Sequence, residues 1–308
     1  MKKRIAFVHN AMWEMYNFRG ELLQELKAKG YEITVICPPD EKNAHYFTDL
    51  GIKLLTVPMS RKGTNIKEDL QLVKNLLKVY KKEKFDLVFH YTIKPNIYGT
   101  LAAKLAGIKS IAITTGLGYV FLHNNITSLI AKFMYKFSLA FANEVWFLND
   151  DDMNIFLDKD LITERQAFKL PSEGINTKRF VPKEKNRKDS KTVFLMIARV
   201  LYDKGFNEYL EAAKLIKAQR NDVEFQLLGA IDSGNPSGVP QSVVEDAVSN
   251  GFINYLGTTS DVLPIIREAD CMVLPSYREG ISRVLMEAAS MEKPIIATNV
   301  TGCREVIN

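Results

Sequence analysis

The chain has 308 residues, of which 46% are hydrophobic and 25% are charged, proportions typical of a globular protein. They exclude a disordered chain, a collagen, a coiled coil and a small disulfide-stabilised scaffold, and the length predicts two domains. The three cysteines lack metal-ligand spacing, as expected for a reduced, cytoplasmic protein. The net charge of +5 is uneven, with +6 on residues 1–170 and −1 on residues 171–308. The basic half indicates either a solvated surface or a contact with an anionic partner.

In the first half, short apolar runs alternate with longer amphipathic stretches. Strands are expected over residues 4–8, 33–37, 53–57, 86–90, 110–114 and 144–148. Most are apolar without strict alternation, which is typical of parallel strands buried on both faces. Helices are expected over residues 18–29, 65–84 and 97–106, lengths that suit crossovers between parallel strands. Residues 1–174 are therefore predicted to form an α/β domain with an open, Rossmann-like parallel sheet.

The amphipathic segment 126–141 stands out in this half. Apolar residues recur every three or four positions, with Lys132 and Lys136 on the other side, which predicts a helix. The helix either faces the core of the first domain or lies on a membrane surface, with its lysines near anionic lipid. No segment is expected to cross a membrane.

The alternation restarts after a polar, lysine- and arginine-rich linker, residues 176–191. Strands are expected over residues 192–198, 223–228, 253–256, 271–274 and 295–297, and helices over 206–219, 241–250, 261–269 and 282–291. Residues 175–308 are therefore predicted to form a second Rossmann-like domain. Ligands of open α/β sheets bind beyond the carboxyl ends of the strands. Two such domains facing each other would hold a ligand in the cleft between them.

Two motifs in the first half have ordinary structural explanations. Gly116-Leu-Gly118 departs from G-x-G-x-x-G at the third glycine, which argues against a nicotinamide cofactor. The run 149–152, Asn-Asp-Asp-Asp, is similar to acidic motifs that hold a divalent cation in some enzymes. It also suits the start of a helix, where acidic residues cap N–H groups and complement the positive helix end. We expect the capping role and no bound metal.

The second half contains the most informative charged residues. Arg199 and Lys204 follow the strand expected to end at residue 198, and a forked guanidinium with a point ammonium suits a diphosphate. Basic residues in loops are also commonly just solvated.

Glu279 and Glu287 bracket the start of the helix expected after the strand 271–274. The N–H groups of residues 280–282 would form an anion site at the helix start. The two carboxylates lie about 12 Å apart along the helix axis, so each could bind sugar hydroxyls on one side of a diphosphate. Alternatively, Glu279 complements the positive helix end and Glu287 lies on the surface, although its otherwise apolar run requires a partner.

Seven stretches in chain order resemble the retaining nucleotide-sugar glycosyltransferases of GT-B fold, glycosyltransferase family 4. Within that family the chain is most similar to capsular-polysaccharide and undecaprenyl-diphosphate-linked oligosaccharide transferases. The matching stretches are residues 16–20, 92–99, 115–121, 195–199, 255–257, 274–280 and 301–305. The family's sequences continue beyond the last stretch, so the second domain is expected to lack the usual closing strand and helices.

The resemblance implies catalytic roles in the second domain. Arg199 and Lys204 would hold the donor diphosphate and stabilise the charge that develops on it as the glycosidic bond breaks. Glu279 would contact the donor sugar. Family members retain the anomeric configuration and require no metal, and the leaving phosphate takes the acceptor proton, so the resemblance implies no cofactor.

Further donor-binding residues follow from the same resemblance. Glu287 would hold the ribose, and the backbone near Gly257 and Thr258 would frame the base. The amides of the helix start would hold the donor sugar and phosphate. These helix-start residues are Gly280, Ile281 and Ser282.

In the first domain, the family often places a histidine at the end of the fourth strand, facing the donor sugar. Spacing to Lys94 puts that position on Tyr91, with His90 one residue earlier. Adjacent strand residues point to opposite faces, so His90 is either a catalytic contact or a buried core residue. The other candidates for the acceptor or the cleft are Asn17, Arg19, Lys94, Gly116 and Gly118.

The sequence therefore predicts a glycosyltransferase that moves a hexose or N-acetylhexosamine from a nucleotide sugar, expected to be UDP-linked, to a lipid-linked saccharide. We expect a role in surface-polysaccharide assembly and a cytoplasmic location on the inner face of the membrane. A nucleotide-sugar 2-epimerase of the same fold is an alternative, with His90 its visible acid–base candidate. A basic nucleic-acid-binding protein is disfavoured because no stripe of cations and stacking aromatics is present.

Overall fold

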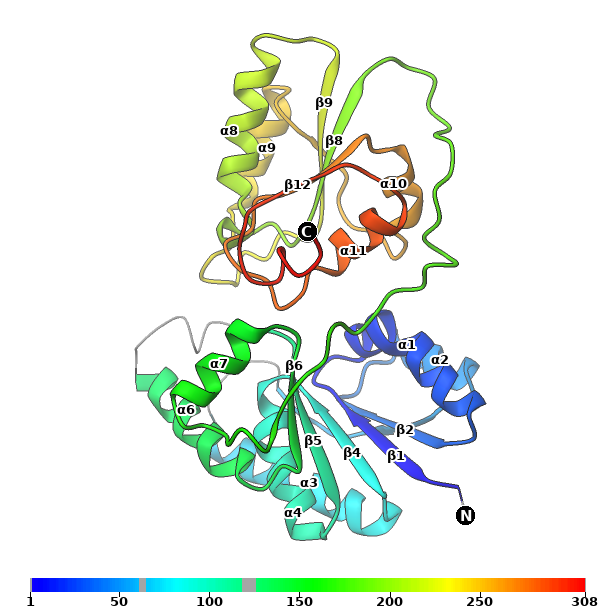
Figure 1. Cartoon of the computed structure of the whole chain (residues 1–308), viewed down its shortest axis with the longest axis vertical. Coiled ribbons are helices and arrows are strands. Elements are labelled where there is room, and N and C mark those ends of the chain that lie inside the picture. Colours follow the sequence, from blue (N-terminus) through cyan, green and yellow to red (C-terminus); the bar gives the residue numbers. More distant parts are fainter. Residues whose placement is uncertain (1, 61–64, 118–125, 308) are drawn as a thin grey trace. The chain divides into compact units, whose positions relative to one another are not determined.

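A computed structural model describes residues 2–60, 65–117 and 126–307. The chain divides into two compact units, Met1–Pro171 and Ser172–Asn308, whereas the sequence suggested a boundary after residue 174. Each unit is a parallel sheet with helices on both faces (Figure 1). The predicted fold class, two open parallel-sheet α/β domains, is confirmed.

Unit 1 contains a sheet of seven strands in the order β3-β2-β1-β4-β5-β6-β7. The six predicted strands are present, and a short edge strand that the sequence analysis missed, β7, pairs with β6. The strands are β1 (Arg4–Val8), β2 (Glu32–Cys37), β3 (Lys53–Thr56), β4 (Leu87–Tyr91), β5 (Lys109–Thr114), β6 (Glu144–Phe147) and β7 (Ala167–Lys169).

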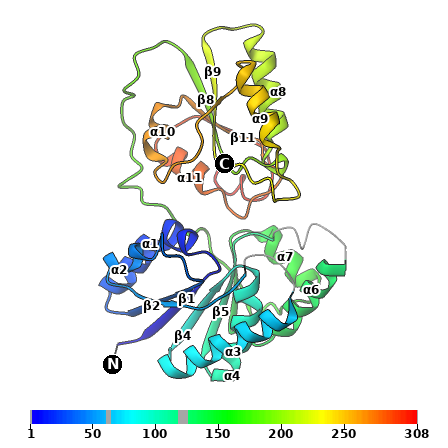
Figure 2. The same cartoon turned by 180° about the vertical axis from the view of Figure 1, so that it is seen from behind.

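Helices cover both faces of this sheet (Figures 1 and 2). They are α1 (Met12–Ala28), α2 (His45–Asp49), α3 (Ile66–Glu83), the π-helix η1 (Pro95–Gly99), α4 (Thr100–Ala106), α6 (Ile126–Leu139) and α7 (Asp150–Asp158). Helix α1 begins at Met12 rather than at the predicted Phe18, because Met12 and Met15 extend its buried face toward the N-terminus. The short helix α2 was not predicted.

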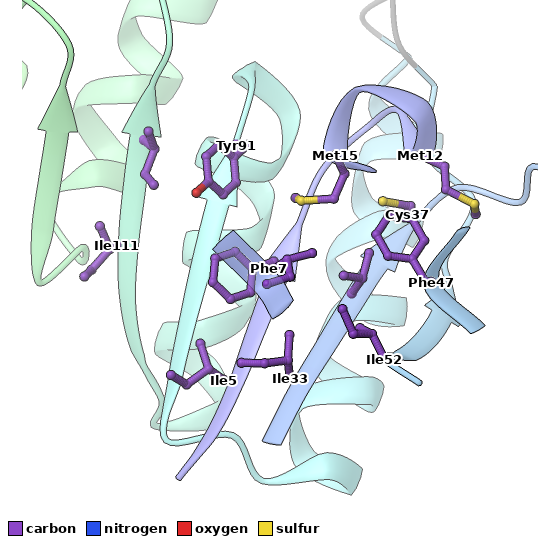
Figure 3. Close-up of a cluster of buried hydrophobic side chains, with 13 residues drawn as sticks. Ile5, Phe7, Met12, Met15, Ile33, Cys37, Phe47, Ile52, Tyr91 and Ile111 are labelled. Carbon is purple, nitrogen blue, oxygen red and sulfur yellow. The ribbon is translucent and has the colours of Figure 1, made fainter. Parts of the chain in front are cut away.

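Alternate side chains of each strand enter different cores of unit 1. Phe7 of β1 and Tyr91 of β4 pack with Met15 of α1 in one core (Figure 3). Ala6 and Val8, which point the other way, pack with residues of α3 and α4. This is the period of two expected for a strand buried on both faces.

Unit 2 contains a five-stranded sheet in the order β10-β9-β8-β11-β12. Its strands are β8 (Thr192–Ile197), β9 (Val223–Leu228), β10 (Asn254–Tyr255), β11 (Cys271–Leu274) and β12 (Ile295–Ala297). Its helices are η2 (Tyr202–Lys204), α8 (Phe206–Lys217), α9 (Gln241–Ser249), α10 (Leu263–Glu268) and α11 (Arg283–Ser290). Helices α8 and α9 contribute to one core and α10 and α11 to the other.

The three cysteines, Cys37, Cys271 and Cys303, are buried and none forms a disulfide. Burial raises the pKa of each thiol, to about 12 for Cys37 and about 11 for Cys303.

Candidate functional site

In unit 2, the predicted donor residues lie at the carboxyl ends of neighbouring strands. Arg199 and Lys204 follow β8, and Glu279 follows β11. In this sheet, β9 and β10 lie on one side of β8, and β11 and β12 lie on the other side. The direction in which successive strands are added therefore reverses at β8. Such a reversal, called a topological switch point, creates a crevice beyond the carboxyl ends of the strands. Open α/β sheets bind their ligands in this crevice.

Lys204 and Glu279 form an ion pair. Lys204 Nζ lies 2.7 Å from Glu279 Oε2, and the two side chains are only 18% and 17% exposed. Lys204 Nζ also donates to the carbonyl oxygen of Arg278 at 3.4 Å. The pair therefore holds the loop after β8 against the loop after β11. Because both side chains are partly desolvated, their electrostatic interaction is stronger than it would be in water.

The backbones of these two loops also touch. The Tyr277 N–H donates to the carbonyl oxygen of Asp203 at 3.0 Å. Gly205 has a φ of +81°, and a Cβ there would lie 2.2 Å from the carbonyl oxygen of Pro275. Only glycine fits both the left-handed backbone and this approach, so Gly205 allows Lys204 to reach Glu279.

A third loop, residues 298–302 after β12, supports Glu279 from the other side. The Glu279 N–H donates to Thr301 O at 2.9 Å, and the Ser282 N–H donates to Gly302 O at 2.8 Å. The expectation that the amides of residues 280–282 start the helix and are free for an anion is therefore wrong for Ser282. Helix α11 begins at Arg283 with Ser282 as its N-cap.

Arg199 is exposed, unlike Lys204, Glu279 and Glu287. Its side chain is 58% exposed, and its guanidinium lies 3.6 Å from Asp232 Oδ2. Asp232 was not among the residues predicted from the sequence. Near the end of β10, the Gly257 carbonyl accepts from the Gly229 N–H at 2.8 Å, and Thr258 is exposed. These groups lie beyond the ends of β8, β9 and β10.

Glu287 lies within α11 and is 6% exposed. Its Oε1 accepts from Arg283 Nε at 2.9 Å, which supplies the partner that its apolar run requires. Burial raises the pKa of this carboxyl, and the Arg283 hydrogen bond partly opposes that rise. Glu287 is therefore a positioned, buried carboxyl rather than a surface residue.

His90 lies in the core of unit 1, which favours the second of its two expected roles, that of a buried core residue. The side chain is fully buried. Its Nε2 lies 2.9 Å from Tyr80 OH and its Nδ1 lies 3.3 Å from Thr100 Oγ1. A Cβ on Gly99 would lie 2.6 Å from the ring. Both ring nitrogens of His90 have hydrogen-bond partners inside the core, so His90 has a structural role.

The burial of His90 predicts acid sensitivity. Burial lowers its pKa to about 3, against about 6.5 in an unfolded chain. Between these values the unfolded state binds the extra proton, so the free energy of unfolding falls as the pH falls, by about 1.4 kcal/mol per pH unit. Urea unfolding at pH 6.5, 5.5 and 4.5 should show a shallower pH dependence for His90→Gln than for the wild type. The exposed His45 provides the control: His45→Gln should keep the wild-type dependence, and an equal dependence in all three proteins would contradict the prediction.

Two further candidates for the acceptor or the cleft, Arg19 and Lys94, are buried in unit 1. The Arg19 guanidinium lies 4.0 Å from the centre of the Tyr91 ring, and Arg19 is 3% exposed. Lys94 Nζ donates to Asp69 Oδ1 and to Ser60 Oγ, both at 2.7 Å. Both cations therefore stabilise the inside of unit 1.

The other three candidates of unit 1 have different surroundings. Asn17 is half-buried on α1. Gly116 borders a cavity at the ends of β4 and β5. Gly118 lies outside the described residues.

The acidic run starts α7 as expected, although its cap is Asn149 rather than an aspartate. Asn149 Oδ1 accepts from the Asp152 N–H at 2.7 Å, and Asp150 pairs with Lys169 at 2.8 Å. Within residues 2–60, 65–117 and 126–307, no three His, Cys, Asp or Glu residues are grouped so that they could hold a metal ion.

Helix α6 exposes an apolar face. Phe133 is 69% exposed and Leu129 is 61% exposed, whereas Tyr135 and Leu139 face the core. The exposed apolar residues of this segment are Leu129, Ile130, Phe133, Phe137 and Phe141, and we call them the α6 face. No described helix is long and apolar enough to cross a membrane.

The fold and the donor-side residues define a class of enzyme. Two Rossmann-like parallel-sheet units are the architecture of GT-B glycosyltransferases. Residues 4–149 match the glycosyl transferase 4-like family, and residues 177–308 match the group 1 glycosyl transferases. Together with a relative that is 32% identical over 99% of the chain, these matches show that the chain belongs to the GT-B glycosyltransferases, with a glycosyl transferase 4-like first half and a group 1 second half.

The similar proteins agree with this assignment. One is the N,N'-diacetylbacillosaminyl-diphospho-undecaprenol alpha-1,3-N-acetylgalactosaminyltransferase of Campylobacter jejuni, which is 32% identical over 99% of this chain and 83% of its own length. Another is the UDP-Gal:alpha-D-GlcNAc-diphosphoundecaprenol alpha-1,3-galactosyltransferase of Escherichia coli, which is 26% identical over 88% of this chain and 72% of its own length. A solved glycosyltransferase from Rickettsia africae shares the fold, with a TM-score of 0.79 and 22% identity over 100% of this chain and 82% of its own.

Proposed function

We propose that this enzyme transfers a hexose or N-acetylhexosamine from a UDP-sugar to a saccharide linked to undecaprenyl diphosphate, in surface-polysaccharide assembly. The observation that carries the proposal is the Lys204–Glu279 pair at the switch point of unit 2. Lys204 and Arg199 supply positive charge for a diphosphate, and Glu279 supplies a carboxylate for sugar hydroxyls. The names of the Campylobacter jejuni and Escherichia coli relatives support the acceptor class, and the name of the Escherichia coli relative supports a UDP-sugar donor.

We propose further that transfer retains the anomeric configuration and requires no metal. Both relatives are named for alpha linkages, and an alpha product from an alpha-linked nucleotide sugar is retention. The cations Arg199 and Lys204 would balance the charge that develops on the leaving diphosphate. The leaving phosphate would accept the proton of the acceptor hydroxyl. Glu287 and the backbone at Gly257 would contact the nucleoside.

The test is a transfer assay with UDP-GalNAc, UDP-Gal, UDP-GlcNAc and UDP-Glc, using undecaprenyl-diphosphate-linked N-acetylhexosamine as acceptor, with and without EDTA. We expect one donor to be used in preference to the others, an alpha-linked product by NMR, and equal rates with and without EDTA. Failure to transfer from any of these donors would contradict the proposed substrates. A beta-linked product would contradict retention, and loss of activity in EDTA that Mn²⁺ or Mg²⁺ restores would contradict metal independence.

The epimerase alternative is weakened by the position of His90. An epimerase requires acid and base side chains beside the sugar, and His90, its candidate in unit 1, is buried between Tyr80 and Thr100. Incubation of the donor without acceptor distinguishes the two reactions, because an epimerase would release an epimeric nucleotide sugar.

We propose that unit 1 associates with the cytoplasmic surface of the membrane through the α6 face. The exposed aromatic rings of Phe133 and Phe137 suit the headgroup boundary, and Lys136 is exposed on the same helix. The ammonium of Lys104, from α4, lies 5.5 Å from the Phe141 ring. Aromatic side chains with neighbouring cations are typical of a helix that lies on an anionic lipid surface.

This proposal predicts that the protein co-sediments with vesicles of phosphatidylglycerol and phosphatidylethanolamine. Phe133→Asp with Phe137→Asp should abolish most of the binding, and Lys136→Glu should reduce it, because each nearby cation contributes about 1 kcal/mol. Raising the salt concentration should also weaken binding. The control is Leu215→Asp, which changes an equally exposed apolar residue of α8. Equal sedimentation of the double variant and this control would show that the α6 face is not the membrane contact.

A further inference from the structure

Glu287 combines a buried carboxyl group with one unused acceptor oxygen. Its side chain is 8% exposed, and its Oε1 accepts from Arg283 Nε at 2.9 Å. Its Oε2 has no hydrogen-bond partner among the described residues. The side of α11 that packs on the core is already filled by Leu285 and Ala288. Because buried polar groups in folded proteins are nearly always hydrogen-bonded, the second oxygen of Glu287 requires a donor.

Three segments of unit 2 meet at Glu287. The first is α11 itself. The second is the segment before β8, whose Phe180 carbonyl accepts from Ser290 Oγ of α11 at 2.6 Å. The third is the loop after β10, where Asp261 Oδ1 lies 2.8 Å from the Arg179 guanidinium of the second segment. The loop after β10 also contains the backbone proposed to contact the nucleoside, so Glu287 lies on the nucleoside side of the donor site.

Arg283 has the geometry to orient this carboxyl group and keep it charged. It precedes Glu287 by four residues, the spacing at which two side chains of one helix are neighbours. Burial raises the pKa of Glu287, and the hydrogen bond and charge of Arg283 oppose that rise more than any other group. Arg179 opposes the rise more weakly, and Asp261 adds to it. Arg283 is therefore the main group that offsets the desolvation of Glu287.

We propose that Arg283 is a positioning residue for the donor, which fixes the Glu287 carboxylate so that its open Oε2 accepts from the ribose hydroxyls of the nucleotide. Arg283 acts through Glu287 and not by touching the nucleotide itself. A charged carboxylate is a stronger acceptor than a neutral group, so the pair suits the two neighbouring hydroxyls of a ribose. The inference rests on the proposed function, since it takes the donor to be a nucleotide sugar.

The test measures, by isothermal titration calorimetry on the full chain, the binding of UDP and of 2′,3′-dideoxy-UDP, which lacks both ribose hydroxyls. The wild type should bind UDP at least about tenfold more tightly than the analogue, as expected for hydrogen bonds to a charged group. Arg283→Leu should weaken UDP binding by about the same factor and leave binding of the analogue unchanged. A general disturbance of the site would instead weaken both ligands.

Three further variants separate positioning from a merely structural role. Arg283→Lys should restore most of the UDP affinity, because an ammonium at this spacing still pairs with Glu287. In a Glu287→Gln background, Arg283→Leu should cause little further loss, because the two groups act as one unit. Arg220→Leu is the matched control: Arg220 Nε also donates to a carboxylate, that of Asp222, at 2.9 Å, but on the surface. This control should bind both ligands as the wild type does.

Steady-state kinetics give an independent readout. The ribose does not react, so its contacts are the same in the ground state and the transition state, and Arg283→Leu should raise the KM for the UDP-sugar with kcat nearly unchanged. If Arg283→Leu does not fold, Arg283→Gln removes the charge with a smaller change of side-chain polarity and serves for the same measurements.

Equal binding of the two ligands by the wild type would overturn the proposal. So would equal weakening of both ligands in Arg283→Leu, or a full further loss in the Glu287→Gln background. If UDP does not bind but ADP or GDP does, the proposed UDP donor is contradicted, and the same comparison with that nucleotide and its dideoxy analogue decides the role of Arg283. If none of the three nucleotides binds, both proposals are overturned.

Discussion

Glu279→Gln is expected to lower the rate of sugar transfer at least about a hundredfold, and Lys204→Ala to lower it by a similar factor, the usual loss when one preorganised charge-stabilising group is removed. Each change removes one member of the 2.7 Å ion pair at the switch point of unit 2. Because the two groups touch, their effects should not add, and the double variant should be little worse than either single variant. The measurement is kcat/KM for the UDP-sugar.

The matched control for these variants is the ion pair between Lys214 and Glu211 on α8, which has the same 2.7 Å separation but lies on the surface. Lys214→Ala should keep the wild-type rate, since exposed pairs contribute little to stability. Circular dichroism should show that all variants are folded. Full activity in Lys204→Ala would mean that the pair is structural and would remove the central support of the proposed donor site.

Gly302→Ala is expected to cause a second large loss, at least about tenfold in activity, by displacing Glu279. Gly302 has a φ of +82°, and an added Cβ would lie 2.4 Å from the Glu279 Cβ and 2.6 Å from its carbonyl oxygen. The backbone of one loop would have to shift, and with it the Thr301 carbonyl that accepts from the Glu279 N–H. The position of a catalytic carboxylate would then change, and small misplacements at such a site are costly.

Gly251→Ala separates this effect from simple backbone strain. Gly251 also has a left-handed backbone, with a φ of +71°, but nothing lies within 4 Å of its added Cβ. Gly251→Ala should lose about 1–2 kcal/mol of stability from the left-handed alanine. Gly302→Ala should lose more because of the added clash, and only Gly302→Ala should lose activity. Equal activity of the two variants would show that the loop after β12 does not position Glu279.

The sequence predicted the central strands well because they are apolar runs whose two faces are both buried. The same reasoning missed β7, whose three residues carry too little pattern, and the first turns of α1, where polar and apolar residues are mixed. The sequence analysis placed Lys204 and Glu279 after the carboxyl ends of two different strands but did not predict that they form an ion pair. The contact between Glu279 and the loop that contains Gly302 could not be predicted from the sequence, because it depends on packing between segments far apart in the chain.

His90 shows why residue type was insufficient in unit 1. A histidine at the end of a strand has the same spacing whether it faces a ligand or the core, and only the positions of Tyr80 and Thr100 decide between them. The burial of Lys94 was not predicted for the same reason, because its partner Asp69 lies on α3, far from Lys94 in the sequence.

The burial of all three cysteines allows the two units to be labelled selectively. A thiolate is the reactive form, and burial both shields Cys37, Cys271 and Cys303 and raises their pKa values. A maleimide at neutral pH should therefore react with an introduced, exposed cysteine and spare the native ones. One new cysteine at Lys109 of unit 1 and another at Glu211 of unit 2, both exposed, would carry a fluorophore pair. Energy transfer between the dyes would then report, molecule by molecule, whether a UDP-sugar changes the distance between the units.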